Sequence, residues 1–134
     1  MKTALMCLFV LLFCTTCKKS KKVEDIPTPP DVALKSRVVA AGLVNPWEII
    51  YGPDDFIWFT EKSGKISRLN PDNGQITPLL TISEVRVNGE GGLLGMVLHP
   101  EFTANPYVYV AYNYGTSYKG KVVRYTYSSG SLNS

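Results

Sequence analysis

Short segments with the composition of β-strands recur along this chain, and no window shows sustained helical periodicity. Turn-forming runs separate them, such as Gly52-Pro53-Asp54-Asp55 and the stretch 70–74, and these suit tight chain reversals. The first three segments are spaced for antiparallel hairpins. An all-β fold is therefore expected, with strands at 47–51, 56–60, 65–69, 75–80, 93–98, 107–112 and 121–127.

A weak internal repeat predicts that these strands form a ring of similar sheets. Pro53 and Pro100 each precede an expected strand, and they lie 47 residues apart. Gly64-Lys65 has a counterpart in Gly120-Lys121, at an offset of 56 residues. Such periods are typical of four-stranded propeller blades with loop insertions. On this register the first blade covers about residues 45–80, whereas the second supplies three strands and stops before its fourth. The predicted fold is a partial β-propeller.

The most distinctive local motif is a glycine-rich loop at residues 89–92, which leads into the apolar segment 93–98. Glycines allow another group to approach the main chain closely. The one acidic side chain among them, Glu90, is expected to be exposed at the mouth of a strand. A phosphate-binding loop is excluded because the Lys-Ser/Thr pair and helix that it requires do not follow.

Taken together, these motifs resemble the glucose/sorbosone dehydrogenase family. The resemblance implies a six-bladed propeller, of which this chain holds about one and three-quarter blades. It also implies oxidation of an aldose at its anomeric carbon with pyrroloquinoline quinone (PQQ) and calcium as cofactors. A histidine takes the hydroxyl proton while hydride passes to the quinone. The stretches that carry the likeness are 43–49, 52–61, 64–71, 89–102 and 105–112.

The resemblance places most of the family's site outside this chain. The base histidine, the cationic residues around the cofactor and the calcium ligands come from later blades. No catalytic, cofactor-binding or metal-binding residue is therefore assigned here, and the fragment is expected to be inactive. The expected partners of the complete enzyme are an aldose and an external electron acceptor.

One site residue of the family does map onto this sequence. The residue before the glycine-leucine-leucine-glycine strand is a sugar-contacting glutamine in the family's soluble glucose dehydrogenases, and the matching position is Glu90. A glutamate can still accept a hydrogen bond from a sugar hydroxyl, but it loses the amide donor and adds charge. The alternative is that Glu90 only satisfies backbone donors of the glycine loop.

The other conspicuous residues are interpreted as structural. His99 belongs to the turn between strands and differs from the family's catalytic histidine motif. The acidic and amide side chains in the two turns at 54–55 and 72–73 lack the regular oxygen-ligand spacing of a calcium loop. The aromatic residues on strands are assigned to packing, with sugar stacking as the alternative; they are Trp47, Trp58, Phe59, Tyr107, Tyr109, Tyr112, Tyr125 and Tyr127.

The N-terminus predicts export. Lys2 precedes an apolar run at residues 4–13, which has the length of a signal-peptide core and is too short to span a bilayer. The following Cys14-Thr15-Thr16-Cys17 resembles a loose bacterial lipobox, so Cys17 is the expected lipid attachment site. An ordinary secretory signal, or cleavage elsewhere, is the alternative. In bacterial lipoproteins an aspartate directly after the lipidated cysteine is linked to retention in the inner membrane. Lys18 occupies that position here, so the outer membrane is the favoured location.

The expected organisation is a signal peptide at 1–16, a disordered tether rich in proline and lysine at 17–35, and the propeller part at 36–134. The formal charge is +3, but five lysines lie near the N-terminus, and residues 32–134 hold nine basic and eight acidic side chains. Nucleic acid is therefore not an expected partner.

Two other functions stay open. One is a non-catalytic propeller that binds carbohydrate or a surface, and the other is an interaction protein that dimerises through open blade edges.

Overall fold

A computed structural model describes residues 32–134 of the chain. The predicted signal peptide, Cys17 and most of the predicted tether lie outside the described residues. Residues 32–35 are exposed and carry no regular secondary structure, and Ser36–Ser134 form one compact unit. Every regular secondary-structure element within residues 32–134 is a β-strand.

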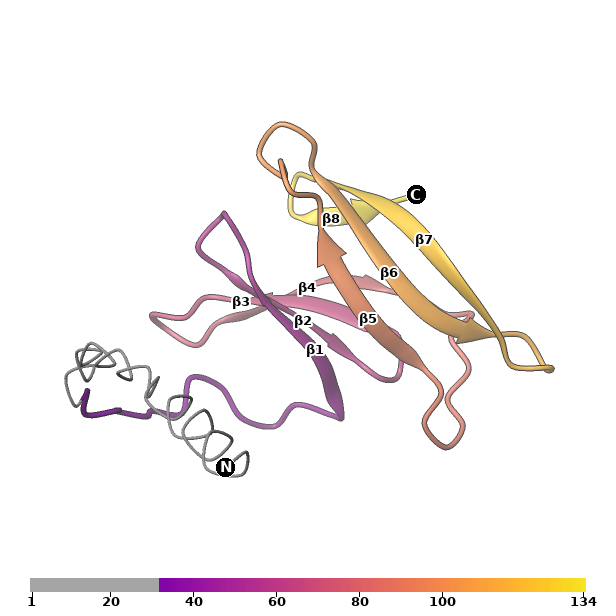
Figure 1. Ribbon diagram of the computed structural model, residues 1–134, viewed down its shortest axis with the longest axis horizontal. Helices are drawn as coiled ribbons and strands as arrows, with labels where there is room; N and C mark the ends of the chain where they lie inside the picture. Colours follow the sequence, from indigo (N-terminus) through magenta and orange to yellow (C-terminus); the bar gives the residue numbers. More distant parts are fainter. Residues whose placement is uncertain (1–31) are drawn as a thin grey trace, which may run out of the picture. The chain divides into compact units, whose positions relative to one another are not determined.

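Two antiparallel four-stranded sheets make up this unit (Figure 1). Hydrogen bonds join the strands of each sheet in chain order, which is the arrangement of a propeller blade. The predicted all-β, partial-propeller fold is confirmed. The first sheet contains β1 (Pro46–Tyr51), β2 (Ile57–Glu61), β3 (Lys65–Leu69) and β4 (Ile76–Thr81), and the second contains β5 (Leu93–Leu98), β6 (Tyr107–Tyr114), β7 (Lys119–Ser128) and β8 (Ser131–Asn133).

The prediction that the second blade stops before its fourth strand is wrong. Strand β8 pairs antiparallel with β7, with Leu132 opposite Tyr127. The reversal between them uses Ser129 and Gly130, both with positive φ (50° and 80°). Leu132 is buried, so even this short strand contributes to the core. Residues 32–134 therefore hold two four-stranded sheets rather than one and three-quarter blades.

Trp58 on β2 lies at the centre of the packing between the two sheets. Its side chain is fully buried, and its ring meets Phe102 and Tyr127 edge to face, at centroid distances of 5.5 and 5.1 Å. Burial of a large apolar side chain contributes about 1.5–3 kcal/mol, and each aromatic pair adds about 0.5–1.5 kcal/mol. The indole Nε1 donates to Asp54 Oδ1 at 2.9 Å, which satisfies its one polar atom.

Arg68 on β3 extends the same cluster. Its guanidinium lies 4.2 Å from the ring centroid of Phe56 and 5.4 Å from that of Tyr127, and its Nη1 lies 3.3 Å from Asp54 Oδ2. Asp54 thus binds the indole and the guanidinium with its two oxygens. The carboxylate in this turn has a structural role, because it binds two side chains of the first sheet that both contact Tyr127 of the second.

The connection from β4 to β5 is tied to the second sheet by Glu84. Its Oε1 accepts a hydrogen bond from the Tyr112 hydroxyl at 2.6 Å and lies 2.8 Å from Lys121 Nζ. The contact with Lys121 has the larger effect and that with Tyr112 the smaller, and together they hold the pKa of Glu84 below its usual value. Burial, and then the bond to Glu84, raises the pKa of the Tyr112 phenol. The tie joins a loop of the first sheet to β6 and β7.

Each sheet also has a face that does not pack on the other sheet. Strand residues alternate between faces, and Ile49 and Tyr51 of β1 are 69% and 64% exposed. On the second sheet Val97 and Val122 are 56% and 71% exposed. Large apolar side chains on an open sheet face, next to unpaired strand edges, favour association with other strands.

We expect residues 32–134 alone not to fold as a stable monomer, because their open faces and edges are left without partners. The measurement is size-exclusion chromatography with light scattering, followed by thermal denaturation monitored by circular dichroism. Aggregates or a broad, non-cooperative transition are expected. A monodisperse monomer with a cooperative melt would contradict this.

Candidate functional site

The candidate site is built on a tight turn of the glycine loop, Asn88–Gly91, which we call the glycine turn. Asn88 and Gly91 form an isolated antiparallel bridge, with the Gly91 N–H donating to the Asn88 carbonyl at 2.8 Å. Gly89 has a φ of +49°, a conformation that glycine adopts without strain. The turn places Glu90 at its tip, where the residue is exposed as predicted.

The backbone donors that follow Glu90 have acceptors other than its carboxylate. The Gly91 N–H is used within the turn, the Gly92 N–H donates to Asn113 Oδ1 at 3.2 Å, and the Leu93 N–H donates to the Lys62 carbonyl at 2.9 Å. The interpretation that Glu90 serves these donors therefore loses support. Its predicted contact with a sugar stays a prediction.

Two residues, one from each sheet, hold the glycine loop, and sequence reasoning did not single out either of them. Lys62, just after β2, donates from Nζ to the Gly89 carbonyl. Asn113 on β6 binds Gly92 through its side chain and through its own N–H, which donates to the Gly92 carbonyl at 3.0 Å. The loop is thereby bound to both sheets.

Close backbone approach at Gly92 brings the two sheets together beside this turn. Gly92 has a φ of +154°, and a Cβ added there would lie 2.6 Å from both Cγ and the carbonyl oxygen of Lys62. Such contacts leave no room for a side chain. The glycine at this position is required by packing, in agreement with the close approach expected from the loop sequence.

Trp47 departs from its predicted role in packing. It is 45% exposed, and the Lys62 ammonium lies over its ring at 5.1 Å from the centroid. The pairing of β1 with β2 is irregular between Pro46 and Ile49, where Trp47 lies. Other predicted core aromatics, such as Trp58 and Tyr112, are buried.

Glu61, beside Lys62, is a buried carboxylate that fixes the start of β1. Its Oε1 accepts from the Val44 N–H at 2.6 Å, and its Oε2 lies 2.9 Å from Lys65 Nζ. Burial alone would raise the pKa of Glu61, but the bonds from Lys65 and Val44 hold it below the usual value. This acid is engaged in structural contacts.

His99 lies in the turn after β5. Its Nδ1 accepts the N–H of Glu101 at 3.1 Å, and its ring stands edge to face against Tyr107 at 5.9 Å between centroids. The backbone N–H of His99 donates to the Tyr107 carbonyl at 2.9 Å. These contacts support the structural interpretation of His99.

The turn at 70–74 has a local explanation for its polar residues. Asn70 Oδ1 accepts the N–H groups of Asp72 and Asn73 at 2.8 and 3.3 Å, which is an Asx-type turn. Within residues 32–134 no three His, Cys, Asp or Glu side chains come together in a way that could hold a metal ion. Nor does the described part of the chain contain a helix long and apolar enough to cross a membrane.

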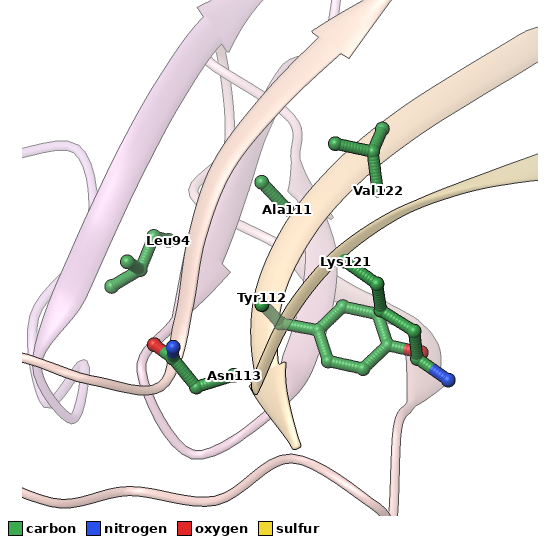
Figure 2. A pocket seen from close by; sticks show the side chains of 7 residues that line it. Leu94, Ala111, Tyr112, Asn113, Lys121 and Val122 are labelled. Atoms are coloured by element: carbon green, nitrogen blue, oxygen red, sulfur yellow. The ribbon is translucent and has the colours of Figure 1, made fainter. Parts of the chain in front are cut away.

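A hollow of about 450 Å³ opens over the second sheet (Figure 2). Leu94, Ala111 and Val122 give it an apolar lining, and Figure 2 shows Tyr112 and Lys121 side by side at its edge. No acid faces a base in this lining. The hollow has the character of a packing surface more than that of a reaction centre.

Comparison with known proteins identifies the class. Residues 43–133 match the family model described as glucose/sorbosone dehydrogenase. This match covers more than half of the chain and spans both sheets and the glycine turn. The chain belongs to the glucose/sorbosone dehydrogenase family.

Individual relatives agree with this assignment. The chain is 35% identical over 97 residues to quinoprotein glucose dehydrogenase B of Acinetobacter calcoaceticus, covering 65% of this chain and 20% of that protein. An aldose sugar dehydrogenase of Escherichia coli is 29% identical over 72 residues, which cover 53% of this chain and 19% of the relative. The chain thus spans about a fifth of the length of these curated relatives.

A solved structure shares the fold. The PQQ-bound form of the aldose sugar dehydrogenase from Streptomyces coelicolor superposes with a TM-score of 0.67 and 28% identity. The superposition covers 72% of this chain and 30% of the other. The two sheets described above therefore correspond to part of that larger protein.

Proposed function

We propose that this chain is the N-terminal part of an exported, PQQ-dependent aldose sugar dehydrogenase, which oxidises a sugar at the anomeric carbon when complete and is inactive as this fragment. The observation that carries the proposal is the superposition on a PQQ-bound aldose sugar dehydrogenase, which uses most of this chain but only 30% of that protein. The family assignment supports the same conclusion. The substrate is an aldose, and electrons leave to an external acceptor.

The described residues do not themselves fit a resident calcium site, because they bring no three candidate ligands together. When bound, the quinone supplies the hydride acceptor. The role that we assign to this chain's own residues is binding: the Glu90 carboxylate accepts a hydrogen bond from a sugar hydroxyl. The base, the cationic pocket and the calcium ligands are assigned to polypeptide outside residues 32–134.

The proposal is tested first by the genomic sequence after the codon for Ser134. We expect it to encode further blades with a histidine base and a cationic pocket. The complete protein, supplied with PQQ and Ca²⁺, should then reduce a dye acceptor in the presence of aldoses, and residues 32–134 should not. Further blades without the base, or a complete protein inactive with both cofactors, would overturn the dehydrogenase assignment.

We predict that Glu90→Gln in the complete enzyme changes KM or the preference among sugars with little effect on the melting temperature. The change removes a charge and adds an amide donor at an exposed tip, so binding is altered while packing is not. The measurement is kcat and KM for a panel of aldoses. Unchanged kinetics for every sugar would remove Glu90 from the site.

His99→Ala is the matched contrast, because its contacts belong to the turn after β5. It should lower the melting temperature and leave kcat near that of the parent enzyme. A well-folded His99→Ala enzyme with abolished turnover would show that the histidine takes part in the reaction.

We further propose that a lipid on Cys17 anchors the protein in the outer membrane. The support is the apolar run before Cys14-Thr15-Thr16-Cys17 and the absence of aspartate after Cys17. Fractionation of cells that express the parent protein and Cys17→Ser tests this. The variant should leave the membrane fraction, and equal membrane retention of both proteins would contradict it.

A further inference from the structure

Lys62 contacts the glycine loop through both its side chain and its backbone. Its ammonium donates to the Gly89 carbonyl, and its own carbonyl accepts the Leu93 N–H at 2.9 Å. Its stem lies against Gly92, where an added Cβ would be 2.6 Å from Lys62 Cγ. A residue of the first sheet thus supports the loop that begins the second.

The bond to Gly89 acts on the peptide group that joins Gly89 to Glu90. A peptide group is planar, so a bond to its oxygen restrains the position of the Glu90 Cα as well. The glycine turn is closed internally by the Asn88–Gly91 bridge, and a Cβ added at Gly89 would meet nothing within 4 Å, so no packed side chain holds the turn at this position. Asn113 restrains the other end of the loop at Gly92. The ammonium of Lys62 therefore adds a restraint from the first sheet on the Glu90 side of the loop.

The ammonium is itself held in place. It lies over the half-exposed ring of Trp47, at 5.1 Å from the centroid, while it donates to the carbonyl. A cation over an indole face is attracted by the negative charge density of the ring. Trp47 and the Gly89 carbonyl thus limit the rotamers that the flexible lysine side chain can adopt.

We propose that Lys62 is a positioning residue for Glu90: its ammonium, held against Trp47, fixes the Gly89–Glu90 peptide so that the carboxylate is presented to a sugar hydroxyl. This rests on the proposed function, in which Glu90 contacts the sugar. Lys62 is partly buried, and a single hydrogen bond makes a modest net contribution to global stability, so its effect is expected on the glycine turn and on substrate binding.

The test compares Lys62→Met with Lys62→Arg in the complete protein. Methionine keeps an apolar stem against Gly92 and removes the cation, whereas arginine keeps a cationic donor near the carbonyl and the ring. Lys119→Met is the matched control, since it removes an exposed lysine from the start of β7. Hydrogen exchange of the segment 86–93 is measured without substrate, and kcat and KM are measured with aldoses.

We expect Lys62→Met to speed exchange in this segment and to lower kcat/KM about tenfold, mainly through KM, the factor that corresponds to loss of about one hydrogen bond. Lys62→Arg should restore both values, and Lys119→Met should change neither. Because Lys62 acts through Glu90, adding Lys62→Met to Glu90→Gln should lower kcat/KM by much less than tenfold.

The outcomes separate this inference from the proposed function. Unchanged exchange and kinetics in Lys62→Met, with altered kinetics in Glu90→Gln, would overturn the positioning role alone. Faster exchange with unchanged kinetics in both variants would overturn the sugar contact of Glu90, and the positioning role with it. An equal loss of melting temperature in the Met and Arg variants would mean a purely structural role.

If Lys62→Met does not fold, Trp47→Leu provides the second variant. Faster hydrogen exchange at 86–93 is expected in it, and unchanged exchange would contradict the proposal.

Discussion

The buried contact between the two sheets at Trp58 is the interaction on which the remaining structure depends. The indole fills the space between β2 and the second sheet, and its one donor is satisfied by Asp54, which also pairs with Arg68. An unpaired indole N–H in this core would carry a desolvation penalty of about 1–3 kcal/mol. The carboxylate in the β1–β2 turn thus allows a polar atom to be buried where the sheets meet. With that contact in place, the glycine loop is brought against the end of β2.

Much of the fold could be predicted from the sequence, because strand alternation and turn chemistry are local signals. The strands around Trp58 and Val110 show these signals clearly, and the structure confirms them. Strand β8 was missed because Ser131–Asn133 is too short to show any period, and its pairing depends on the reversal at Gly130. Trp47 was assigned to packing from its strand context, but an irregularity in the β1–β2 pairing leaves it half exposed.

The candidate site was less accessible to sequence reasoning. Glu90 was found through family resemblance, and a lone acid among glycines gave it a physical signature as well. Lys62 and Asn113 gave no comparable signal, because their contacts join residues 27 and 21 positions apart in the sequence. A lysine in a polar turn and an asparagine in a strand have many ordinary explanations. Only the three-dimensional arrangement shows that both hold the same loop.

The tie between Glu84 and the second sheet bears on the order in which the polypeptide becomes structured during synthesis. Glu84 leaves the ribosome before its partners, and Tyr112 follows 28 residues later. Until β6 and β7 have been translated, the nascent first sheet carries an acid without its phenol and ammonium partners. The first sheet can therefore form its hairpins early, but the β4–β5 connection makes its contacts only after the second sheet has formed. During synthesis, the second sheet is thus needed to complete the contacts of the segment that leaves the first.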